Sequence, residues 1–375
     1  MKKRKIIAVI AVCLCTFTLF ITVQELFDHK ESWHGKFYVG VELAYGDFED
    51  YRFMVNEVKK YTNLVVIGSP EISLNQTLLN EICDYIYGSG LNFIVLFTSP
   101  IEYLYNPYVW IIKAREKYGE KFLGVYRIDE PGGKQVDNDE YKFVVKAGNF
   151  TEAANTYVEI LYAHLEYYIY SGAKVFTSDY ALYWFDYKSG YDCVLTQFGW
   201  NHSKELHTAL CRGAAKVQDK EWGVIITWKY NNMPFIESGE EMYNDMVVAY
   251  HAGANYVVIF NYPKVSRFGV LTEEHLVALK RFWEYINLYP ERYGMDRGCA
   301  VYVLPESYGF GFRNMHDNLW GLWYSDGLSE KVWSDLRYLL SVYGLSLDVV
   351  YCEKEFLDVI KGKYDKVFFW NETIR

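Results

Sequence analysis

From Phe37 onward, short apolar runs rich in β-branched residues alternate with longer stretches that have helical spacing. An apolar run buried on both faces and followed by an amphipathic helix is typical of a βα unit in a parallel sheet. Eight such runs precede Pro290, and they begin at Phe37, Asn63, Leu91, Phe122, Lys174, Asp192, Gly223 and Tyr256. Eight units in about 250 residues predict a (β/α)8 barrel, also called a TIM barrel.

The stretches between these runs predict the helices of the barrel. The expected helices cover residues 48–61, 74–87, 107–118, 151–170, 204–217, 239–251 and 272–286. The fifth unit is short, because few residues separate Lys174 from Asp192. Only a short helix near residues 181–185 fits there.

A second α/β segment follows Tyr289-Pro290. It has strand candidates at residues 299–304, 346–351 and 366–371, with helices near 329–343 and 353–361. We therefore expect the barrel over residues 31–290 and a smaller, doubly wound α/β domain, complete or partial, over residues 291–375.

The N-terminus has the pattern of a segment that enters a membrane. Four cations at residues 2–5 precede an uncharged apolar run at residues 6–23, which is long enough to cross a bilayer as a helix. No small-x-small cleavage site precedes Gln24, although a cleaved signal peptide has the same cationic start. We expect residues 1–30 to form a signal anchor and linker, with a secreted protein as the alternative. The positive-inside rule places the body outside the cytoplasm in both cases.

The net charge and the spacing of two motifs argue against several other classes of function. A net charge of -10 repels polyphosphate, so nucleic acid is a poor partner. His202 and His207 are five residues apart, unlike the i, i+4 pair of a helical zinc site. The sequence GFGFRN from Gly309 lacks the third glycine of a dinucleotide-binding loop. We expect neither a metal nor a cofactor.

The residues that follow the strands suggest a glycan as the ligand. In a (β/α)8 barrel the working side chains lie after the C-terminal strand ends. Here those positions hold carboxylates, amides and aromatic rings, which suit acid catalysis and stacking on sugar rings. The candidates for substrate binding are Glu42 and Tyr45 after the first strand, Gln197 and Trp200 after the sixth, Trp228, Lys229 and Tyr230 after the seventh, and Asn261 and Tyr262 after the eighth. Polar residues also follow strands that leave any sheet, which is the structural alternative.

The most specific element is GVYRIDEPGG, residues 124–133, in which Asp129 and Glu130 end the fourth strand before Pro131. Glu130 resembles the acid/base position of the clan-A glycoside hydrolases. The order of a barrel and then a small α/β domain resembles the β-galactosidases whose barrel precedes an amidotransferase-like domain. The resemblance implies a glycosidase with Glu130 as general acid. Those families also carry a nucleophilic Glu at the end of strand seven, where this chain has Trp228 and Lys229.

The missing strand-seven carboxylate leaves three alternatives open. The Asp-Glu pair also resembles the substrate-assisted hexosaminidases, in which the Glu is the acid and the Asp holds the 2-acetamido group. Alternatively, Asp179 or Glu42 activates water in an inverting mechanism. In the third, the chain is a catalytically inactive carbohydrate-binding barrel. Successive strand residues face opposite sides, so Asp129 and Glu130 share a site only if the strand has already broken before Pro131.

Overall fold

The computed structural model of this protein describes residues 37–137, 141–262 and 265–374. The predicted anchor at residues 1–30 lies outside the described residues. Over the described ranges, no helix combines the length and the apolar character needed to span a bilayer.

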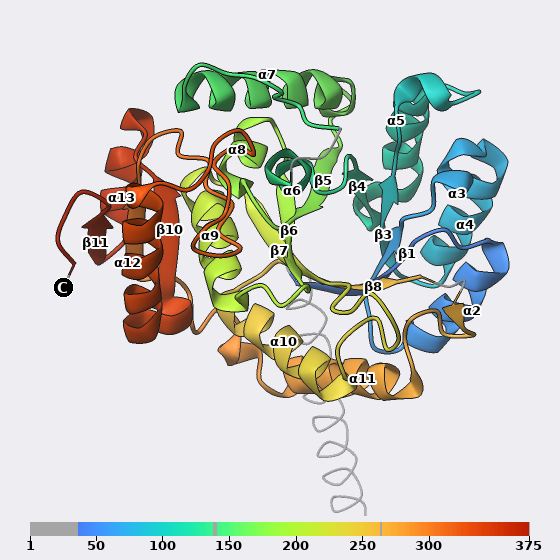
Figure 1. Cartoon of the computed structure of the whole chain (residues 1–375). Helices are drawn as coiled ribbons and strands as arrows, with labels where there is room; N and C mark the ends of the chain where they lie inside the picture. The colour runs from blue at the N-terminus through green and yellow to red at the C-terminus, as the bar shows by residue number, and fades with distance from the viewer. Residues whose placement is uncertain (1–36, 138–140, 263–264, 375) are drawn as a thin grey trace, which may run out of the picture. The chain divides into compact units, whose positions relative to one another are not determined.

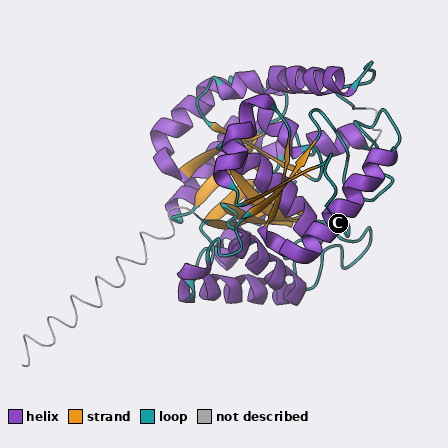
Figure 2. Ribbon diagram, turned by 90° about the vertical axis from the view of Figure 1, so that its left-hand side faces the viewer, coloured by secondary structure: helices purple, strands orange, loops and turns teal. Residues whose placement is uncertain are grey.

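Eight strands form a closed barrel in which consecutive strands pair in parallel (Figure 1). Figure 2 shows the strands at the centre with helices around them. The apolar runs are buried on both faces, as parallel strands covered by helices require. All eight predicted strands are confirmed: β1 (Tyr38–Leu43), β2 (Leu64–Ile67), β3 (Asn92–Leu96), β4 (Phe122–Tyr126), β5 (Lys174–Asp179), β6 (Cys193–Phe198), β7 (Glu221–Ile226) and β8 (Tyr256–Asn261).

One main helix follows each strand. In chain order these are α2 (Phe48–Val58), α4 (Gln76–Gly88), α5 (Pro107–Tyr118), α7 (Phe150–Ile169), α8 (Tyr183–Lys188), α9 (Lys204–Val217), α10 (Gly239–Ala252) and α11 (Glu273–Leu288). Side-chain caps mark many of the starts, because an Asp, Asn or Ser oxygen accepts a backbone N–H that the first turn leaves unpaired. Ser203 caps α9 and Ser238 caps α10 in this way. The fifth helix is short, as predicted.

Two further short helices were not predicted. These are α3 (Pro70–Leu74) and α6 (Pro131–Val136), each with a proline at its first position. They are too short to show helical periodicity in the sequence, although proline at the first turn is a known start signal.

The C-terminal segment forms a separate parallel sheet with the order β10-β9-β11. Its elements are β9 (Ala300–Leu304), α12 (Gly327–Tyr343), β10 (Leu347–Tyr351), α13 (Leu357–Lys363) and β11 (Lys366–Phe369). This sheet and the barrel belong to one compact unit, Val39–Arg375. The resemblance to an amidotransferase-like domain stays a prediction.

A buried ion pair joins the sheet to the barrel. Arg212 on α9 donates from Nε to Asp348 on β10 at 2.7 Å, and both side chains are almost fully buried. Its other nitrogens donate to backbone carbonyls that include Asp296 and Leu347. The backbones lie close here, since a Cβ on Gly213 would stand 2.5 Å from the Val349 carbonyl oxygen. The sheet therefore packs directly on a barrel helix.

Candidate active site

The loops after the barrel strands hold most of the strained backbone in the described residues. Seven of the eleven non-glycine residues with positive φ follow β1, β4, β5, β6 or β7. They are Tyr45, Ile128, Glu130, Leu182, Trp200, Asn201 and Phe235. Such strain concentrates at functional sites, because the surrounding structure must hold it in place. The C-terminal end of the barrel is therefore the candidate location of the site.

The segment after β4 breaks the strand alternation just before the acidic pair. Ile128 and Glu130 both adopt left-handed conformations, with φ values of 54° and 55°. Thr177 holds this bend by donating to the Ile128 carbonyl at 2.5 Å, and the Glu130 amide donates to the Ser178 carbonyl at 2.9 Å. The strand thus ends before Asp129, so the pleat no longer dictates which way the two carboxylates face.

Asp129 and Glu130 belong to one hydrogen-bonded network. Ser178 donates to Asp129 Oδ1 at 2.8 Å, and the Tyr126 hydroxyl donates to the same oxygen. Gln197 donates from Nε2 to Glu130 Oε1 at 2.7 Å and to Ser178 Oγ at 3.1 Å. Strands β4, β5 and β6 therefore hold the two carboxylates together, and the predicted site residue Gln197 contacts the predicted acid.

Glu130 has the protonation behaviour that a general acid requires. Burial and the charge of the neighbouring Asp129 together raise the pKa of Glu130 to about 7, and the hydrogen bond from Gln197 opposes the rise. A carboxyl group with a pKa near neutrality is still partly protonated at the pH where it must donate.

Glu42 lies at the end of β1 and is 8% exposed. Burial raises the pKa of Glu42 to about 8, and the charge of Asp129 adds to the rise. Gly68 on the next strand makes room for it, because a Cβ there would stand 2.5 Å from Glu42 Oε1. At neutral pH this carboxyl group is mainly protonated. It suits a hydrogen-bond donor to a ligand better than a base.

Asp179 is placed differently from the expectation of a water-activating base. Its side chain is fully buried. The backbone amides of Gly132 and Gly133 donate to its two oxygens at 2.5 and 2.8 Å, and those of Tyr180 and Ala181 donate to Oδ1 at 2.7 and 3.1 Å. Burial raises the pKa of Asp179 to about 7, against the effect of these four donors. This geometry favours a positioning role at the start of α6.

A cavity of about 260 Å³ adjoins Glu130. It is lined by Glu130, Asp137, Tyr180, Trp200, His202 and Arg313. Trp200 was expected at the site, whereas Asp137, His202 and Arg313 were not. His202 lies in the motif considered for zinc and Arg313 in the GFGFRN motif considered for phosphate. Both motifs stood out in the sequence, but nothing in them indicated that they lie beside Glu130.

The end of β7 is occupied by packing and ion pairs. Trp228 contacts the rings of Phe235 and Phe260 at centroid distances of 5.5 and 5.1 Å. Lys229 turns toward α10 and pairs with Glu241 at 2.9 Å. Glu241 therefore competes with a ligand for the side chain of Lys229. Tyr230 is 40% exposed in the loop that follows.

Glu237, which follows in the same loop, is not a substitute for the missing nucleophile. It is 3% exposed, and Lys204 pairs with it at 3.0 Å. It also shares a hydrogen bond with the buried Asp245, whose pKa burial raises to about 8.

The end of β8 gives one buried residue and one at the rim. Asn261 is fully buried and accepts the Val270 amide at 3.0 Å, so it shapes the loop after β8 instead of facing a ligand through that oxygen. The ring of Tyr262 meets Tyr45, which is 47% exposed, in an edge contact at 5.9 Å. Tyr45 and Tyr262 thus form an aromatic pair after β1 and β8, and their contact with a substrate stays a prediction.

Arg127 precedes Asp129 by two residues, and no ion pair joins it to a carboxylate in the described part of the chain. Its guanidinium lies 5.8 Å from the centre of the Tyr168 ring.

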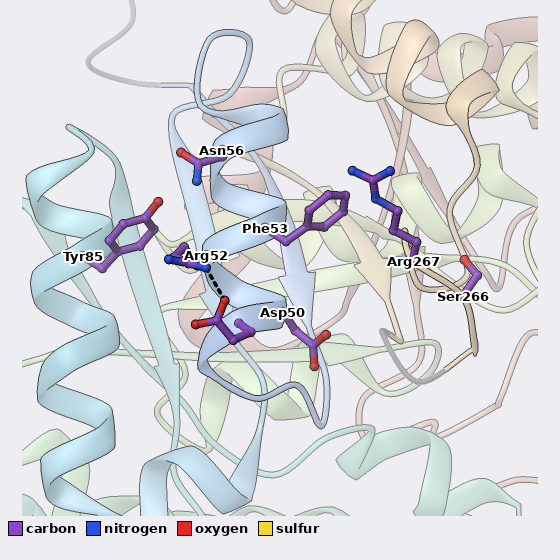
Figure 3. A pocket seen from close by; sticks show the side chains of 8 residues that line it. Asp50, Arg52, Phe53, Asn56, Tyr85, Ser266 and Arg267 are labelled. Carbon is purple, nitrogen blue, oxygen red and sulfur yellow. Dashed lines mark hydrogen bonds and ion pairs between the residues drawn. The ribbon is translucent and has the colours of Figure 1, made fainter.

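A second cavity, of about 670 Å³, contains none of the site carboxylates (Figure 3). It is an open groove on the outside of the barrel, lined by residues of α2 and α4 and by Ser266 and Arg267. Arg267 lies over the ring of Phe53 at 4.8 Å. The smaller cavity, and not this groove, borders Glu130.

Comparison with known proteins supports the fold. No family model and no curated protein sequence matches the chain. Among solved structures, alpha-L-fucosidase isoenzyme 2 from Paenibacillus thiaminolyticus aligns with a TM-score of 0.51 and 11% identity, covering 89% of this chain and 64% of the fucosidase. The endo-1,4-beta-mannanase from Eisenia fetida aligns with a TM-score of 0.44 and 8% identity, over 65% of this chain and 90% of the mannanase. The pneumococcal virulence factor StrH aligns with a TM-score of 0.45 and 9% identity, over 68% of this chain and 86% of that structure. The alignment with the fucosidase agrees with the TIM-barrel fold of the chain.

Proposed function

We propose that this protein is a glycoside hydrolase that uses Glu130 as its general acid. The observation that carries the proposal is the Glu130 carboxyl group itself. It lies at the C-terminal end of the barrel, beside a cavity, and burial raises its pKa to about 7. Protonation of a departing glycosidic oxygen needs a carboxyl group in this state.

Asp129 is the best second carboxylate of the four candidates. The hydroxyl groups of Tyr126 and Ser178 both donate to Oδ1 of Asp129 and not to Oδ2. Asp129 is an exposed residue. Asp179 is enclosed by backbone amides, Glu42 is mainly protonated at neutral pH, and Glu237 is buried in ion pairs. Of these four carboxylates, Asp129 is the one that offers an oxygen to a substrate next to the acid.

This pair supports a substrate-assisted reaction on 2-acetamido sugars. Glu130 gives its proton to the leaving oxygen while the acetamido carbonyl oxygen bonds to the anomeric carbon and the glycosidic bond breaks. Asp129 accepts the acetamido N–H and stabilises the charge that develops on the ring. Water then attacks the anomeric carbon and gives its proton to Glu130. The bond between the anomeric carbon and the acetamido oxygen breaks.

The experiment compares two variants on 2-acetamido glycans and on the matching 2-hydroxy glycans. We expect hydrolysis of the 2-acetamido substrates alone, with Glu130→Gln and Asp129→Asn each reducing kcat by at least about 100-fold. Glu240→Gln, an exposed acid on α10, is the control for a carboxylate-to-amide change. Unchanged turnover of a natural glycan by Glu130→Gln would exclude Glu130 as the acid.

A second candidate function is carbohydrate binding without turnover. The observation that favours it is the end of β7, where Trp228 and Lys229 replace the catalytic Glu of clan-A enzymes and are held by packing and an ion pair. In this case a glycan array detects binding by the wild type, while no glycan is cleaved and Glu130→Gln binds equally well.

The proposal also includes a location outside the cytoplasm. Its support is the sequence of residues 1–30, with four cations before an apolar run. We expect the full chain in the membrane fraction and its body accessible to external protease. A mature soluble form that begins near Gln24 would indicate secretion instead.

A further inference from the structure

We infer that the cavity beside Glu130 is the subsite for the leaving sugar, and that Arg313 positions that sugar as a neutral group. This inference rests on the proposed hydrolase function. It gives the C-terminal segment a part in the site, although Arg313 lies after β9 and outside the barrel strands.

The position of the cavity follows from the role of the acid. A general acid touches the glycosidic oxygen, so the two sugars of the substrate lie on either side of it. Asp129 and Gln197 both belong to the hydrogen-bonded network that reaches Glu130. Neither of them lines the cavity. The sugar that reacts belongs with Asp129, which leaves the cavity for the sugar that departs.

Arg313 is held rigidly and still has donors to offer. Its Nε and Nη2 donate to Asp317 at 2.9 and 2.6 Å, and Nη1 pairs with Asp137. A guanidinium has five N–H groups, so three of them are engaged by the described residues, which leave two for sugar hydroxyl groups. Asp317 is itself fixed by the backbone amides of Arg313 and Asn318 at 2.9 and 2.8 Å.

The segment that carries Arg313 is tied to the helix that begins at the acid. Gln135 on α6 donates to the Trp320 carbonyl at 2.8 Å, and Lys142 donates to the Gly321 carbonyl at 2.5 Å. The Tyr180 hydroxyl donates to Asp137 at 2.5 Å. A displacement of this segment would therefore also displace the residues around Glu130.

The charges of the cavity favour a neutral sugar. Arg313 is flanked by the two carboxylates of Asp137 and Asp317, so no net positive charge remains for an acidic sugar. The exposed indole of Trp200, 38% accessible, supplies an apolar face for the ring. A neutral hexose or N-acetylhexosamine fits these properties.

The test compares substrates that differ only in the leaving group. Arg313→Lys keeps the charge but loses the planar fork, so it does not leave the two carboxylates without a cation. We expect kcat/KM to fall by about tenfold or more on an oligosaccharide and by much less on the aryl glycoside of the same reacting sugar, whose leaving group cannot use sugar-directed hydrogen bonds. Arg281→Lys, at an exposed pair, should lower neither value. Equal losses on both substrates, or none, would overturn the inference.

A binding measurement separates this inference from the proposed function. If the wild type cleaves neither substrate, the hydrolase proposal fails, and the subsite is then tested by titrating free N-acetylglucosamine and glucose while following the indole N–H signals by NMR. The signal that Trp200→Phe removes should shift in the wild type and shift less in Arg313→Lys. If neither sugar shifts it in the wild type, the subsite is excluded as well.

Discussion

At the scale of single residues, the pKa of Glu130 is determined by opposing influences. Burial favours the neutral carboxyl group, and the amide of Gln197 stabilises the charged form. Gln197→Leu removes a donor to the carboxylate, so we expect the pKa to rise. The alkaline limb of kcat/KM against pH should move up by about half to one pH unit.

The pH profile also shows whether Glu130 is the titrating acid. Gln218→Leu changes an amide that donates to the Trp184 carbonyl, away from the site carboxylates, and should leave the alkaline limb in place. An unmoved limb in Gln197→Leu would mean that another group sets it.

Glu42 links the site to the pH dependence of stability. Its pKa is about 8 in the folded state and 4.5 is the ordinary value for a glutamate, so between these two values the folded state holds a proton that the unfolded state has lost. The free energy of unfolding therefore decreases as pH rises through this window, by up to about 1.4 kcal/mol per unit from this group.

Glu42→Gln replaces the protonated carboxyl group by a neutral group of similar shape and removes this dependence. We expect its advantage over the wild type in urea unfolding to be larger at pH 8 than at pH 5. The difference between the two proteins isolates Glu42 from the other buried carboxyl groups. An equal difference at both values would show that Glu42 titrates normally.

At the scale of elements, the junction of β4 and α6 depends on glycine. A Cβ on Gly133 would stand 2.2 Å from the ring of Tyr180, and one on Gly132 would stand 2.4 Å from the Ala181 carbonyl oxygen. The two glycines let the helix start approach β5, where Asp179 caps it. This close approach places Glu130 at the barrel mouth.

Gly133→Ala tests this junction. We expect a loss of about 1–3 kcal/mol in the free energy of unfolding, because the ring of Tyr180 must move, together with a loss of activity. Gly88→Ala is the matched control, since nothing lies within 4 Å of its Cβ and alanine favours helix. That variant should be neutral or slightly more stable. Equal behaviour of the two variants in thermal unfolding would contradict the packing argument.

At the scale of the whole molecule, the C-terminal sheet depends on the barrel through the buried pair of Arg212 and Asp348. Removal of Arg212 leaves the buried Asp348 with Lys216 at 3.7 Å and the Tyr364 hydroxyl at 2.8 Å, which compensate its charge less well than the guanidinium does. Arg212→Ala should therefore reduce the free energy of unfolding by about 3–5 kcal/mol. Arg281→Ala breaks an exposed pair with Glu240 and should cost less than about 1 kcal/mol. Urea unfolding of both variants measures the difference, and a small loss in Arg212→Ala would mean that the sheet is held by other contacts.

The sequence alone was enough for the strands, the main helices and their order. The eight barrel strands and the three C-terminal strands stand where their apolar runs predict them, because buried parallel strands leave a pattern in consecutive residues. The same reasoning placed Glu130, Asp129, Gln197 and Trp200 at one end of the barrel, since parallel strands bring their C-terminal ends to one rim.

Only the tertiary structure decided which of these side chains meet. Gln197 reaches Glu130 across 67 residues of chain, and Arg313 enters the site from beyond the barrel strands. Asp179 looked like a possible base in the sequence, yet close packing made it the cap of α6. Periodicity records burial along a segment, whereas these contacts depend on barrel closure and on glycines that allow close approach. The reactive state of a carboxyl group depends on such long-range contacts, because burial and neighbouring charges set its pKa.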